Sequence, residues 1–506
     1  MHKILTITSF LNRSNKFYRI FSVPKWLVNK LNSMSFPQFE EGHVHVVKKA
    51  LKLEEDNFIY PRPISITEVK DSDQKEMELR SVDKTLNIFN DPVVISFVNK
   101  LWEDWNMSTF RPEPLNFSKC IELLPNTTST GFPNFKKKSD EKEILYAEKL
   151  FSDFKSKKFV DTKLQLLLDY PSVIFHRYTP KLNSKKTKKV ISYKIRQVFC
   201  LSYFITCLEV SLFYPFMDRF YKVADSFFTG KDTRVEISNK IQKVRFKAAT
   251  ENGVILCGDI SGCDRSQSAD SMKLFFSFIG SNYTNTEFKN FLALIKFLIF
   301  TPTVDSNGDY HVTNGTVSSG SYITTVINTF IVNMALNVSY FKLYGEFIPK
   351  ESHLVQGDDF IILLKNPNDY PSFCEYMFDF NLKVKKMDQT ISYPSEDILF
   401  LGFFWDVNGE PDQTNEWIFT RIIFPERYIN QEGPERLISR YLSLIFLLKR
   451  STLLFNCFLF YDDYLRFKLR YDSNPSFRIV NNNGQLTDIR INIQLLLQYG
   501  WRAYLV

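Results

Sequence analysis

Alternation between apolar runs and short polar breaks predicts strands in the second half of the chain. The largely apolar runs 353–356 and 360–364 enclose the tripeptide Gly-Asp-Asp at 357–359, which predicts two strands joined by a tight acidic turn. An earlier apolar run at 254–258 ends at Asp259. We therefore expect acidic side chains at the ends of neighbouring strands.

Longer apolar stretches predict buried helices. The segment from Ser319 to Asn328 has the spacing S-G-x3-T-x3-N, in which a flexible Ser-Gly loop opens an apolar helix. The segments 291–300 and 442–460 are the most apolar of the chain, but lysine or Lys-Arg interrupts each of them. Neither offers the roughly 18 uninterrupted apolar residues of a membrane span, so both are predicted to be buried helices. Helical periodicity is also pronounced from Pro434 onward.

Composition places the chain among globular proteins. Its 506 residues are 44% hydrophobic and include 49 Phe, which is ample for one large or several smaller cores and excludes a disordered chain. The net charge of +8 suits a polyanionic partner, although a basic surface also serves solubility. The 7 cysteines form no C-x2-C pairs, so we expect free thiols in a reducing compartment. The first residues lack the apolar core of a signal peptide, and secretion is not expected.

The acidic residues predict a site for divalent metal ions. Asp358 and Asp359 lie at a hairpin tip, and Asp259 ends a strand about a hundred residues earlier. Mg²⁺ prefers hard oxygen ligands and needs only one or two carboxylates when substrate phosphates supply the rest. Two alternatives remain for the single pieces, because an Asp-Asp turn is usually solvated and a Ser-Gly pair before a helix is usually an N-cap.

Taken in order, these segments resemble the palm of viral RNA-dependent RNA polymerases. Asp259 and Asp264, at D-x4-D spacing, resemble motif A; residues 319–328 resemble motif B; and residues 357–359 resemble motif C. The string Ser-Gly-Ser-Tyr-Ile-Thr is most similar to polymerases of the partitivirus and picobirnavirus type. Many of those carry Asp where this chain has Asn328, and this departure is toward the picornavirus-like pattern.

The resemblance implies roles for the acidic residues and for the residues of motif B. Asp259, Asp358 and Asp359 would be catalytic and hold Mg²⁺, for which Mn²⁺ could substitute. Asp264 would bind the 2′-hydroxyl of the incoming ribonucleotide together with Ser319, Thr324 and Asn328 of motif B. Gly320 would belong to the same substrate-binding segment. The alternative for Thr324 and Asn328 is a polar stripe that satisfies its own hydrogen bonds within the fold.

A basic strand resembles motif F, which holds the nucleotide triphosphate. Lys194 and Arg196 alternate as K-x-R, which places them on the same face of a strand. The guanidinium of Arg196 has a planar fork that matches phosphate. The preceding lysine run is predicted to be a solvated loop without a specific role. It comprises Lys185, Lys186, Lys188 and Lys189.

Three weaker resemblances agree in their position along the chain. Ser129, Thr130 and Gly131 resemble motif G, a turn that would touch the template RNA, although a Gly/Pro turn is the simpler reading. Residues 381–386 resemble motif D, in which a lysine protonates the leaving pyrophosphate. Lys385 is our candidate, with Lys383 and Lys386 as the other lysines there. Residues 400–405 resemble motif E, the primer-gripping hairpin, although an aromatic run is more often explained by core packing.

Family membership would imply an α+β fold, a closed right hand of fingers, palm and thumb. The palm at 259–405 would be an antiparallel sheet with helices, with a fingers insertion at 280–312. Residues 111–258 would form the fingers, and residues 406–506 a mostly helical thumb. Residues 1–110 would wrap over fingers and thumb.

The implied function is template-directed RNA synthesis from nucleoside triphosphates with release of pyrophosphate. It would replicate and transcribe a viral genome by primer-independent initiation, in the virion interior or the cytoplasm of an infected cell. Partners would be the RNA template and product, with a viral capsid protein as a further candidate. A reverse transcriptase is disfavoured by Gly357 and by the Asp264/Asn328 pair. A non-catalytic RNA-binding packaging protein with a palm fold is disfavoured because all three carboxylates are present.

Overall fold

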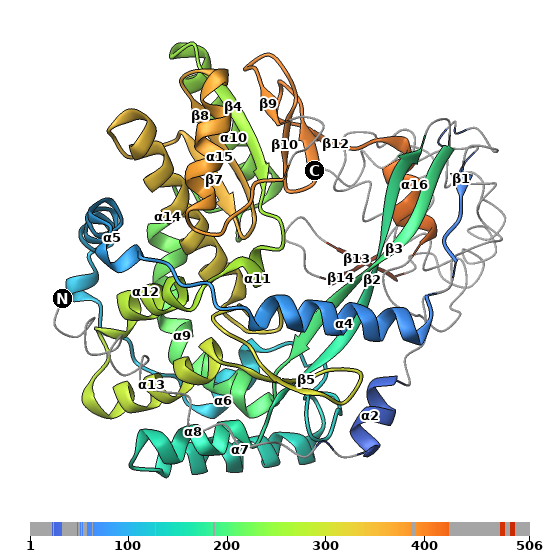
Figure 1. Ribbon diagram of the computed structural model, residues 1–506, viewed down its shortest axis with the longest axis vertical. Helices are drawn as coiled ribbons and strands as arrows, with labels where there is room; N and C mark the ends of the chain where they lie inside the picture. Colours follow the sequence, from blue (N-terminus) through green and yellow to red (C-terminus); the bar gives the residue numbers. More distant parts are fainter. Residues whose placement is uncertain are drawn as a thin grey trace.

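The structure of the protein is a computed structural model (Figure 1). It describes residues 23, 25–32, 48, 51, 53, 58–62, 64–126, 128–185, 188–385, 390–424, 476–480 and 486–490. The predictions for 442–460, for the helices after Pro434 and for most of the thumb lie outside these residues.

An antiparallel sheet of four strands forms the upper part of the molecule in Figure 1. Its order is β7 (His353–Gln356), β8 (Asp359–Leu364), β4 (Val254–Asp259) and β9 (Ile391–Ser392). The three strands predicted around Asp259 and Asp358 are thereby confirmed. The sequence could indicate them because each is a short apolar run that ends at a polar turn.

Both faces of this sheet are buried. Ile255, Cys257 and Ile361 pack on one face against α10 (Arg234–Thr250). The alternate residues of the same strands, such as Leu256 and Ile362, join the main core with α14 (Thr324–Tyr344). Alternation with a period of two explains how each strand supplies both cores. The helix predicted after the Ser-Gly loop is α14.

A second sheet is built on a long hairpin. Its order is β1 (Phe58–Ile59), β3 (Lys188–Cys200), β2 (Ser172–Lys185), β5 (Pro302–Val304) and β6 (Tyr310–Val312). The strands β2 and β3 pair along their whole length, from Val173 with Cys200 to Lys185 with Lys188. The prediction of a loop at the lysine run is therefore wrong at Lys185, Lys188 and Lys189, because backbone pairing continues into the run. Lys186 lies outside the described residues.

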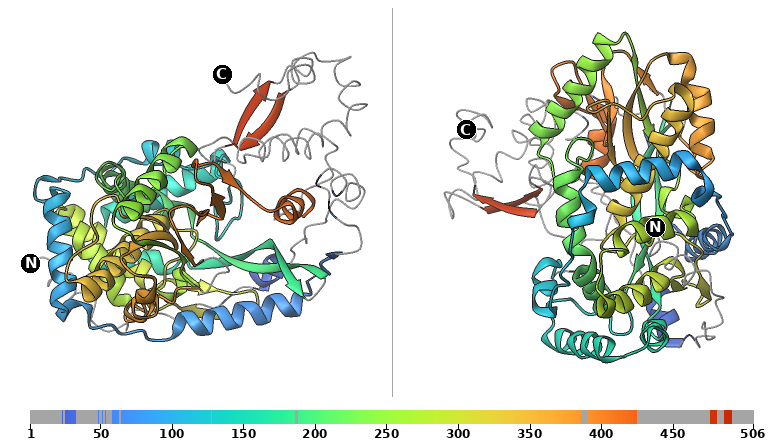
Figure 2. Two further views of the ribbon diagram at one scale, coloured as in Figure 1. Left: turned by 90° about the horizontal axis from the view of Figure 1, so that it is seen from above. Right: turned by 90° about the vertical axis from the view of Figure 1, so that its left-hand side faces the viewer.

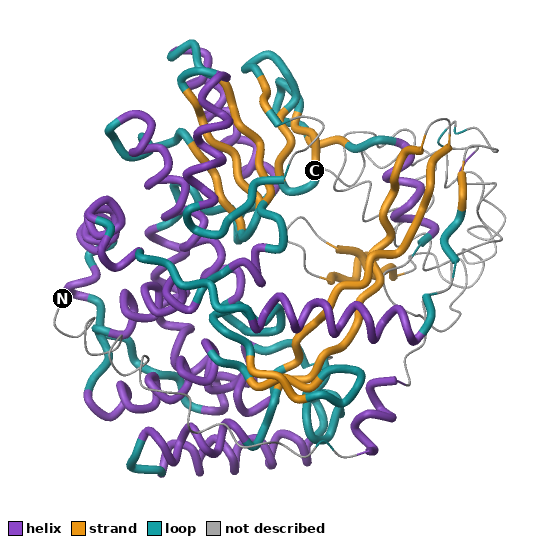
Figure 3. Tube along the Cα trace, viewed as in Figure 1, coloured by secondary structure: helices purple, strands orange, loops and turns teal. Residues whose placement is uncertain are grey.

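Helices surround the lower end of this hairpin and line the main core (Figure 3). Aromatic side chains dominate this core, including Phe213, Phe275 and Phe330. The apolar segment predicted at 291–300 is confirmed as the buried α13. The helices are α5 (Pro92–Asp104), α6 (Phe117–Leu123), α7 (Glu141–Ser156), α8 (Val160–Leu168), α9 (Tyr203–Val223), α12 (Ala269–Gly280) and α13 (Asn285–Ile299).

The N-terminal part of the chain crosses the long hairpin. The helix α4 (Ile66–Ser81) runs alongside β2 and β3, as two views in Figures 1 and 2 show. Ser65 caps α4 in a capping box with Glu68, which explains where the helix begins. Ser72 joins α4 to β3, because its Oγ accepts a hydrogen bond from Gln197 Nε2 at 2.8 Å.

The tip of the hairpin meets α16 (Asn415–Ile423), which follows the strands of the upper sheet in sequence. The rings of Phe58 and Phe419 lie 5.0 Å apart, and Lys48 Nζ lies over both. Lys189 Nζ lies 3.3 Å from Glu416. We call this set of contacts between the N-terminal segment, the hairpin tip and α16 the clasp. It joins segments that are far apart in sequence.

The remaining elements are short, and several of them connect the larger ones. Among the described residues no helix is long and apolar enough to cross a membrane. These elements are α2 (Lys25–Asn32), the 3-10 helices η3 (Ile88–Asn90), η4 (Met107–Thr109) and η5 (Pro367–Asp369), α11 (Cys263–Ser266), α15 (Tyr370–Phe378), the sheet of β10 (Ile398–Phe400), β11 (Phe403–Trp405) and β12 (Pro411–Asp412), and the pair β13 (Ser476–Val480) and β14 (Leu486–Arg490).

Candidate active site

Three acidic residues lie at one end of the strands of the upper sheet. Asp259 and Asp359 are direct partners in the pairing of β4 with β8. Asp358 occupies the turn, where its carbonyl accepts a hydrogen bond from Ile260 N at 3.0 Å. Gly357 has φ +64°, a left-handed conformation that the tight turn requires and that glycine adopts without strain. The sheet register thus brings together residues that are a hundred positions apart.

Burial and neighbouring negative charges raise the pKa of two of these carboxyl groups. Burial, followed by the charges of Asp358 and Asp259, raises the pKa of Asp359 to about 7. Burial, and then the charge of Asp259, also raises the pKa of Asp358. A nearby positive charge would stabilise the ionised form of these carboxylates.

A lysine supplies one positive charge to the cluster. Lys385 Nζ lies 2.7 Å from Oδ1 and 2.6 Å from Oδ2 of Asp259, and Lys385 N donates to the Asp259 carbonyl at 2.8 Å. An ammonium group bound by both oxygens shows that the carboxylate accepts a cation at this position. The donor set of hard oxygens fits a divalent ion such as Mg²⁺.

A separate group of potential ligands belongs to the β5–β6 hairpin. Ligand atoms of Asp305, Asp309 and His311 all lie within 4.8 Å of one another. The Asp305 carboxylate, however, already accepts hydrogen bonds from the backbone N of Asn307 and Asp309 and contacts His311 Nε2 at 3.0 Å. These bonds account for the cluster as a stabilised turn.

The residues predicted to sense the sugar separate into two groups. Asp264 Oδ1 accepts a hydrogen bond from Asn328 Nδ2 at 2.6 Å, so the structure brings these two together. Gly262 in a left-handed conformation (φ +61°) turns the chain after Asp259 and begins α11, which carries Asp264. Burial raises the pKa of Asp264, and Arg80 and the bond from Asn328 oppose this rise.

Ser319 and Thr324 point their hydroxyl groups into the protein instead. Ser319 Oγ accepts from Phe199 N at 3.2 Å and donates to the Gln197 carbonyl at 3.3 Å. Thr324 Oγ1 donates to the Ser318 carbonyl at 2.7 Å. For Thr324 the alternative of internal satisfaction therefore describes its contacts, whereas Asn328 reaches Asp264.

Gly320 lies where the motif B loop presses against β3. A Cβ atom at this position would lie 1.9 Å from the carbonyl oxygen of Phe199. Only glycine permits this approach of two backbones. Its part in the site is thus to seat the loop on the strand.

The basic residues predicted to hold the triphosphate are exposed on β3. Lys194 and Arg196 are two positions apart on this strand. Partial desolvation by the neighbouring protein, and then the charges of Arg196 and Lys385, lower the pKa of Lys194. The positive charges of β3 are therefore felt near the carboxylate cluster.

The turn predicted to touch the template lies at the lower end of Figure 1, beside α7. Thr130 is buried; its Oγ1 accepts from Lys136 N at 3.1 Å, and its carbonyl accepts from Tyr203 N at 2.9 Å. Gly131 is also buried, and its φ is +68°. Ser129 remains partly exposed. The side chain of Thr130 is thus already used within the fold.

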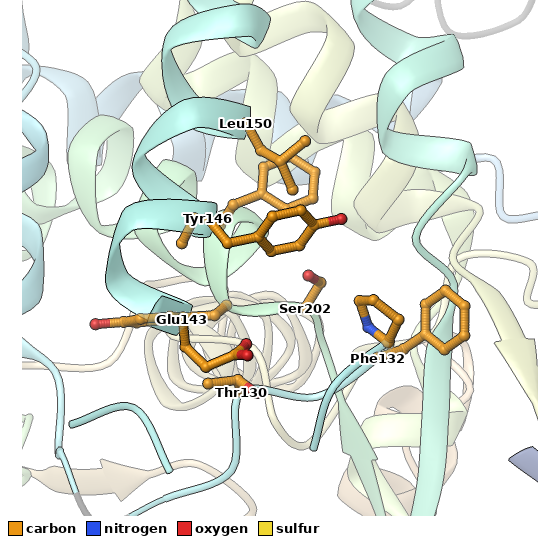
Figure 4. Close-up of a pocket in the computed structure, with 10 residues that line it drawn as sticks. Thr130, Phe132, Glu143, Tyr146, Leu150 and Ser202 are labelled. Carbon is orange, nitrogen blue, oxygen red and sulfur yellow. The ribbon is translucent and has the colours of Figure 1, made fainter. Parts of the chain in front are cut away.

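A small hollow adjoins this turn (Figure 4). Its empty volume is about 210 Å³, including the part open to solvent. Residues of the turn, of α7 and of the start of α9 line it, and those labelled in the figure are Thr130, Phe132, Glu143, Tyr146, Leu150 and Ser202. Its mixed lining includes no group that the carboxylate site uses.

The segment predicted as motif E forms a hairpin. Its strands β10 and β11 pair from Ile398 with Trp405 to Phe400 with Phe403. Trp405 is buried and its indole N donates to the Phe400 carbonyl at 3.0 Å. Core packing therefore accounts for part of the aromatic run.

Sequence comparison identifies the family. The family model of viral RNA-dependent RNA polymerases matches residues 72–412, which include every motif described above. The chain belongs to this family. It is accordingly an RNA-directed RNA polymerase, a nucleotidyltransferase that makes viral RNA from nucleotides on an RNA template. Polymerases of this family use divalent metal ions.

Solved structures of human picobirnavirus polymerases share the fold of this polymerase. An insertion-loop deletion mutant matches with a TM-score of 0.61 at 15% identity, covering 92% of this chain and 84% of the other. A second structure matches with a TM-score of 0.61 at 15% identity and covers 90% and 83%. The predicted right-hand α+β fold and picobirnavirus-type resemblance are confirmed. No curated protein matches the sequence.

Two features of the polymerase site were not predicted. Glu209 of α9 is fully buried, accepts a hydrogen bond from Ser321 Oγ, and accepts another from Tyr322 N at 3.2 Å. It therefore holds the motif B loop from behind. Its only signal in the sequence was an acidic residue within the apolar first half of a helix.

The second unpredicted feature is Arg80 of α4, which lies near Asp264. It is 4% exposed and its NH1 donates to the Val317 carbonyl at 2.9 Å. In the sequence it belongs to a mixed-charge helical stretch, where a charged residue is usually solvated. Only the packing of α4 distinguishes it from its neighbours.

Proposed function

We propose that Asp259, Asp358 and Asp359 hold the divalent ions of nucleotidyl transfer, with Mg²⁺ as the usual ion and Mn²⁺ able to replace it. The direct pairing of Asp259 with Asp359 across β4 and β8 is the observation that carries this proposal. Carboxylates on paired strands have a separation fixed by the sheet. Two such ions stabilise the attacking and leaving oxygens of an in-line displacement.

We propose Lys385 as the proton donor of the reaction. Its ammonium group lies within hydrogen-bonding distance of Asp259, at the cluster where the phosphates would react. As general acid, it would protonate the leaving pyrophosphate. This assignment requires Lys385 to leave the Asp259 carboxylate when substrate and metal bind.

The other residues orient the substrates. Asp264, with Asn328, would bind the 2′-hydroxyl, while Ser319, Gly320 and Thr324 shape the motif B loop that seats the nucleotide. Lys194 and Arg196 would hold the triphosphate from β3. The turn at Ser129, Thr130 and Gly131 would border the template, through exposed backbone and Ser129 rather than through the buried Thr130 side chain.

We further propose the division into an N-terminal region at 1–110, fingers at 111–258, palm at 259–405 and thumb at 406–506. The fingers insertion at 280–312 is supported by β5, which pairs with β2. Initiation would be primer-independent, in the virion interior or the cytoplasm of an infected cell, with a capsid protein as a candidate partner.

The test is incorporation of labelled nucleotide by the full chain on single-stranded RNA without primer, with Mg²⁺ or Mn²⁺. The control is Asp358→Asn, which keeps the shape of the side chain and removes its charge. We expect product from the native enzyme alone, with RNA binding retained in the variant because phosphate contacts do not depend on this carboxylate. Full activity of the variant would place the metal site elsewhere.

A product that forms only after an annealed primer is added would reject primer-independent initiation while leaving the metal site intact. The comparison between the native enzyme and Asp358→Asn is then repeated with that primer. The two proposals are therefore tested separately.

A further inference from the structure

Helix α4 lies outside the polymerase motifs, yet it contacts the loops that carry them. Ser72 accepts a hydrogen bond from Gln197 of β3, and Arg80 donates to Val317 just before motif B. The carbonyl of Arg80 accepts from Asn314 N at 3.0 Å. One helix thus touches the basic strand and the approach to motif B.

The contact with motif A is made through ion pairs. Glu76 Oε1 lies 2.9 Å from Arg80 Nε, and Glu76 Oε2 lies 2.9 Å from NH1 of Arg265, the residue after Asp264. Burial alone would raise the pKa of Glu76, but Arg80 and Arg265 hold it below its usual value. The carboxylate therefore stays charged and joins two arginines.

A continuous chain of bonds leads from this ion pair to Asp264. Arg80 NH1 donates to the Val317 carbonyl, and Val317 N donates to the Asp264 carbonyl at 2.9 Å. The position of Asp264 is thus fixed on one side by Asn328 and on the other by Val317 and Arg265. Arg80 holds Val317, and Glu76 holds Arg265.

Arg80 itself cannot move easily. Its guanidinium lies over the ring of Phe199, with 4.0 Å between the guanidinium carbon and the ring centroid. Phe199 N in turn donates to Ser319 Oγ in the motif B loop. A planar cation packed on an aromatic ring, with two directed hydrogen bonds, has a single favourable orientation.

We propose that Glu76 and Arg80 of α4 are positioning residues for discrimination between ribose and deoxyribose, acting through Val317 and Arg265 on the sugar-sensing Asp264. This inference rests on the proposed role of Asp264 and deepens it. It gives part of the N-terminal region, which has no motif, a task in substrate selection. The site for the 2′-hydroxyl is then built by three segments, of which α4 is the support.

The test compares kcat/KM for a ribonucleotide with kcat/KM for its 2′-deoxy analogue, during elongation of an annealed primer by the full chain. The variants are Glu76→Gln, which removes the shared charge, and Arg80→Lys, which keeps the charge and loses the fork. Glu78→Gln is the matched control, because Glu78 is exposed on the same helix and its side chain contacts Gln74.

We expect the ratio of the two kcat/KM values to fall about tenfold in both variants, since displacement of a substrate-contacting group by a remote change has effects of this order. The control should keep the native ratio. A merely structural role would lower use of both nucleotides alike. An unchanged ratio, or equal loss of both activities up to complete inactivity in both variants, would overturn the inference.

Asp264→Ala separates this inference from the role on which it rests. If Asp264→Ala lowers the ratio while the α4 variants do not, the positioning role is wrong and the sugar-sensing role stands. If Asp264→Ala leaves the ratio unchanged, the sugar-sensing role is wrong and the positioning inference is overturned with it.

Discussion

Lys385 places one positive charge beside the carboxylates that we propose as metal ligands. Lys385 contacts both oxygens of Asp259, while burial and then the charges of Asp358 and Asp259 raise the pKa of nearby Asp359. In our proposal a divalent ion also binds Asp259, so the ion would compete with the ammonium group for this carboxylate and would displace it. In our proposal the displaced lysine becomes available as the proton donor.

Replacing Lys385 by Gln should therefore strengthen the binding of Mg²⁺ and slow the reaction. The Mg²⁺ concentration for half-maximal incorporation should fall, because no cation competes for Asp259. The maximal rate should fall by about 100-fold, because the general acid is lost. A Mg²⁺ titration of incorporation measures both effects. Lys383→Gln is the control, since Lys383 is exposed nearby; an unaltered Mg²⁺ requirement in Lys385→Gln would disprove the competition.

The buried Glu209 should make stability depend on pH. Burial raises its pKa to about 7, above the unfolded value near 4.5, so the folded state binds the extra proton between these values. The free energy of unfolding should then decrease by about 3 kcal/mol as pH rises from 4.5 to 7, and remain level above that.

Glu209→Gln removes this titration and should flatten that part of the pH dependence. Urea unfolding at several pH values measures it in both proteins, and the difference between them isolates Glu209 from the other titrating groups. Parallel curves for the two proteins would show that Glu209 does not carry the effect.

At the scale of elements, the strands and the helix of the motifs could be predicted because their signals are local. The runs at β4, β7 and β8 are apolar and end at polar turns, and a Ser-Gly loop precedes α14. The lysine run was mispredicted because a long two-stranded ribbon tolerates charged residues at its tip. Contacts that join distant segments, such as Arg80 with Val317, left no local pattern at all.

The clasp should behave as a coupled unit. Phe58 and Phe419 are in ring contact, so their replacement by Ala should be non-additive, with a coupling energy of about 0.5–1.5 kcal/mol. The measurement is a double-mutant cycle of unfolding free energies. Phe58 paired with the exposed Phe246 of α10 is the control cycle and should give no coupling. Equal coupling in both cycles would contradict the clasp.

At the scale of the whole molecule, metal binding should stabilise the fold. An ion that binds only the native state adds RT ln(1 + [L]/Kd) to the free energy of unfolding, about 2.7 kcal/mol at a hundredfold excess over Kd. Thermal unfolding across a Mg²⁺ titration should show a rising midpoint. In Asp358→Asn the midpoint without metal should be higher, because one repelling charge is gone, and its rise with Mg²⁺ smaller. An identical rise in both proteins would refute metal binding at Asp358.

The register that pairs Asp259 with Asp359 also sets the order of events during synthesis on the ribosome. Strand β4 can pair fully with β8 only after Leu364 has left the exit tunnel. Helix α4 is made earlier, but it can contact residues 314–317 only after these have been translated. Long-range pairing of this kind forms late. A growing chain therefore has no catalytic centre until most of it has been translated, so incomplete translation products are inactive as enzymes.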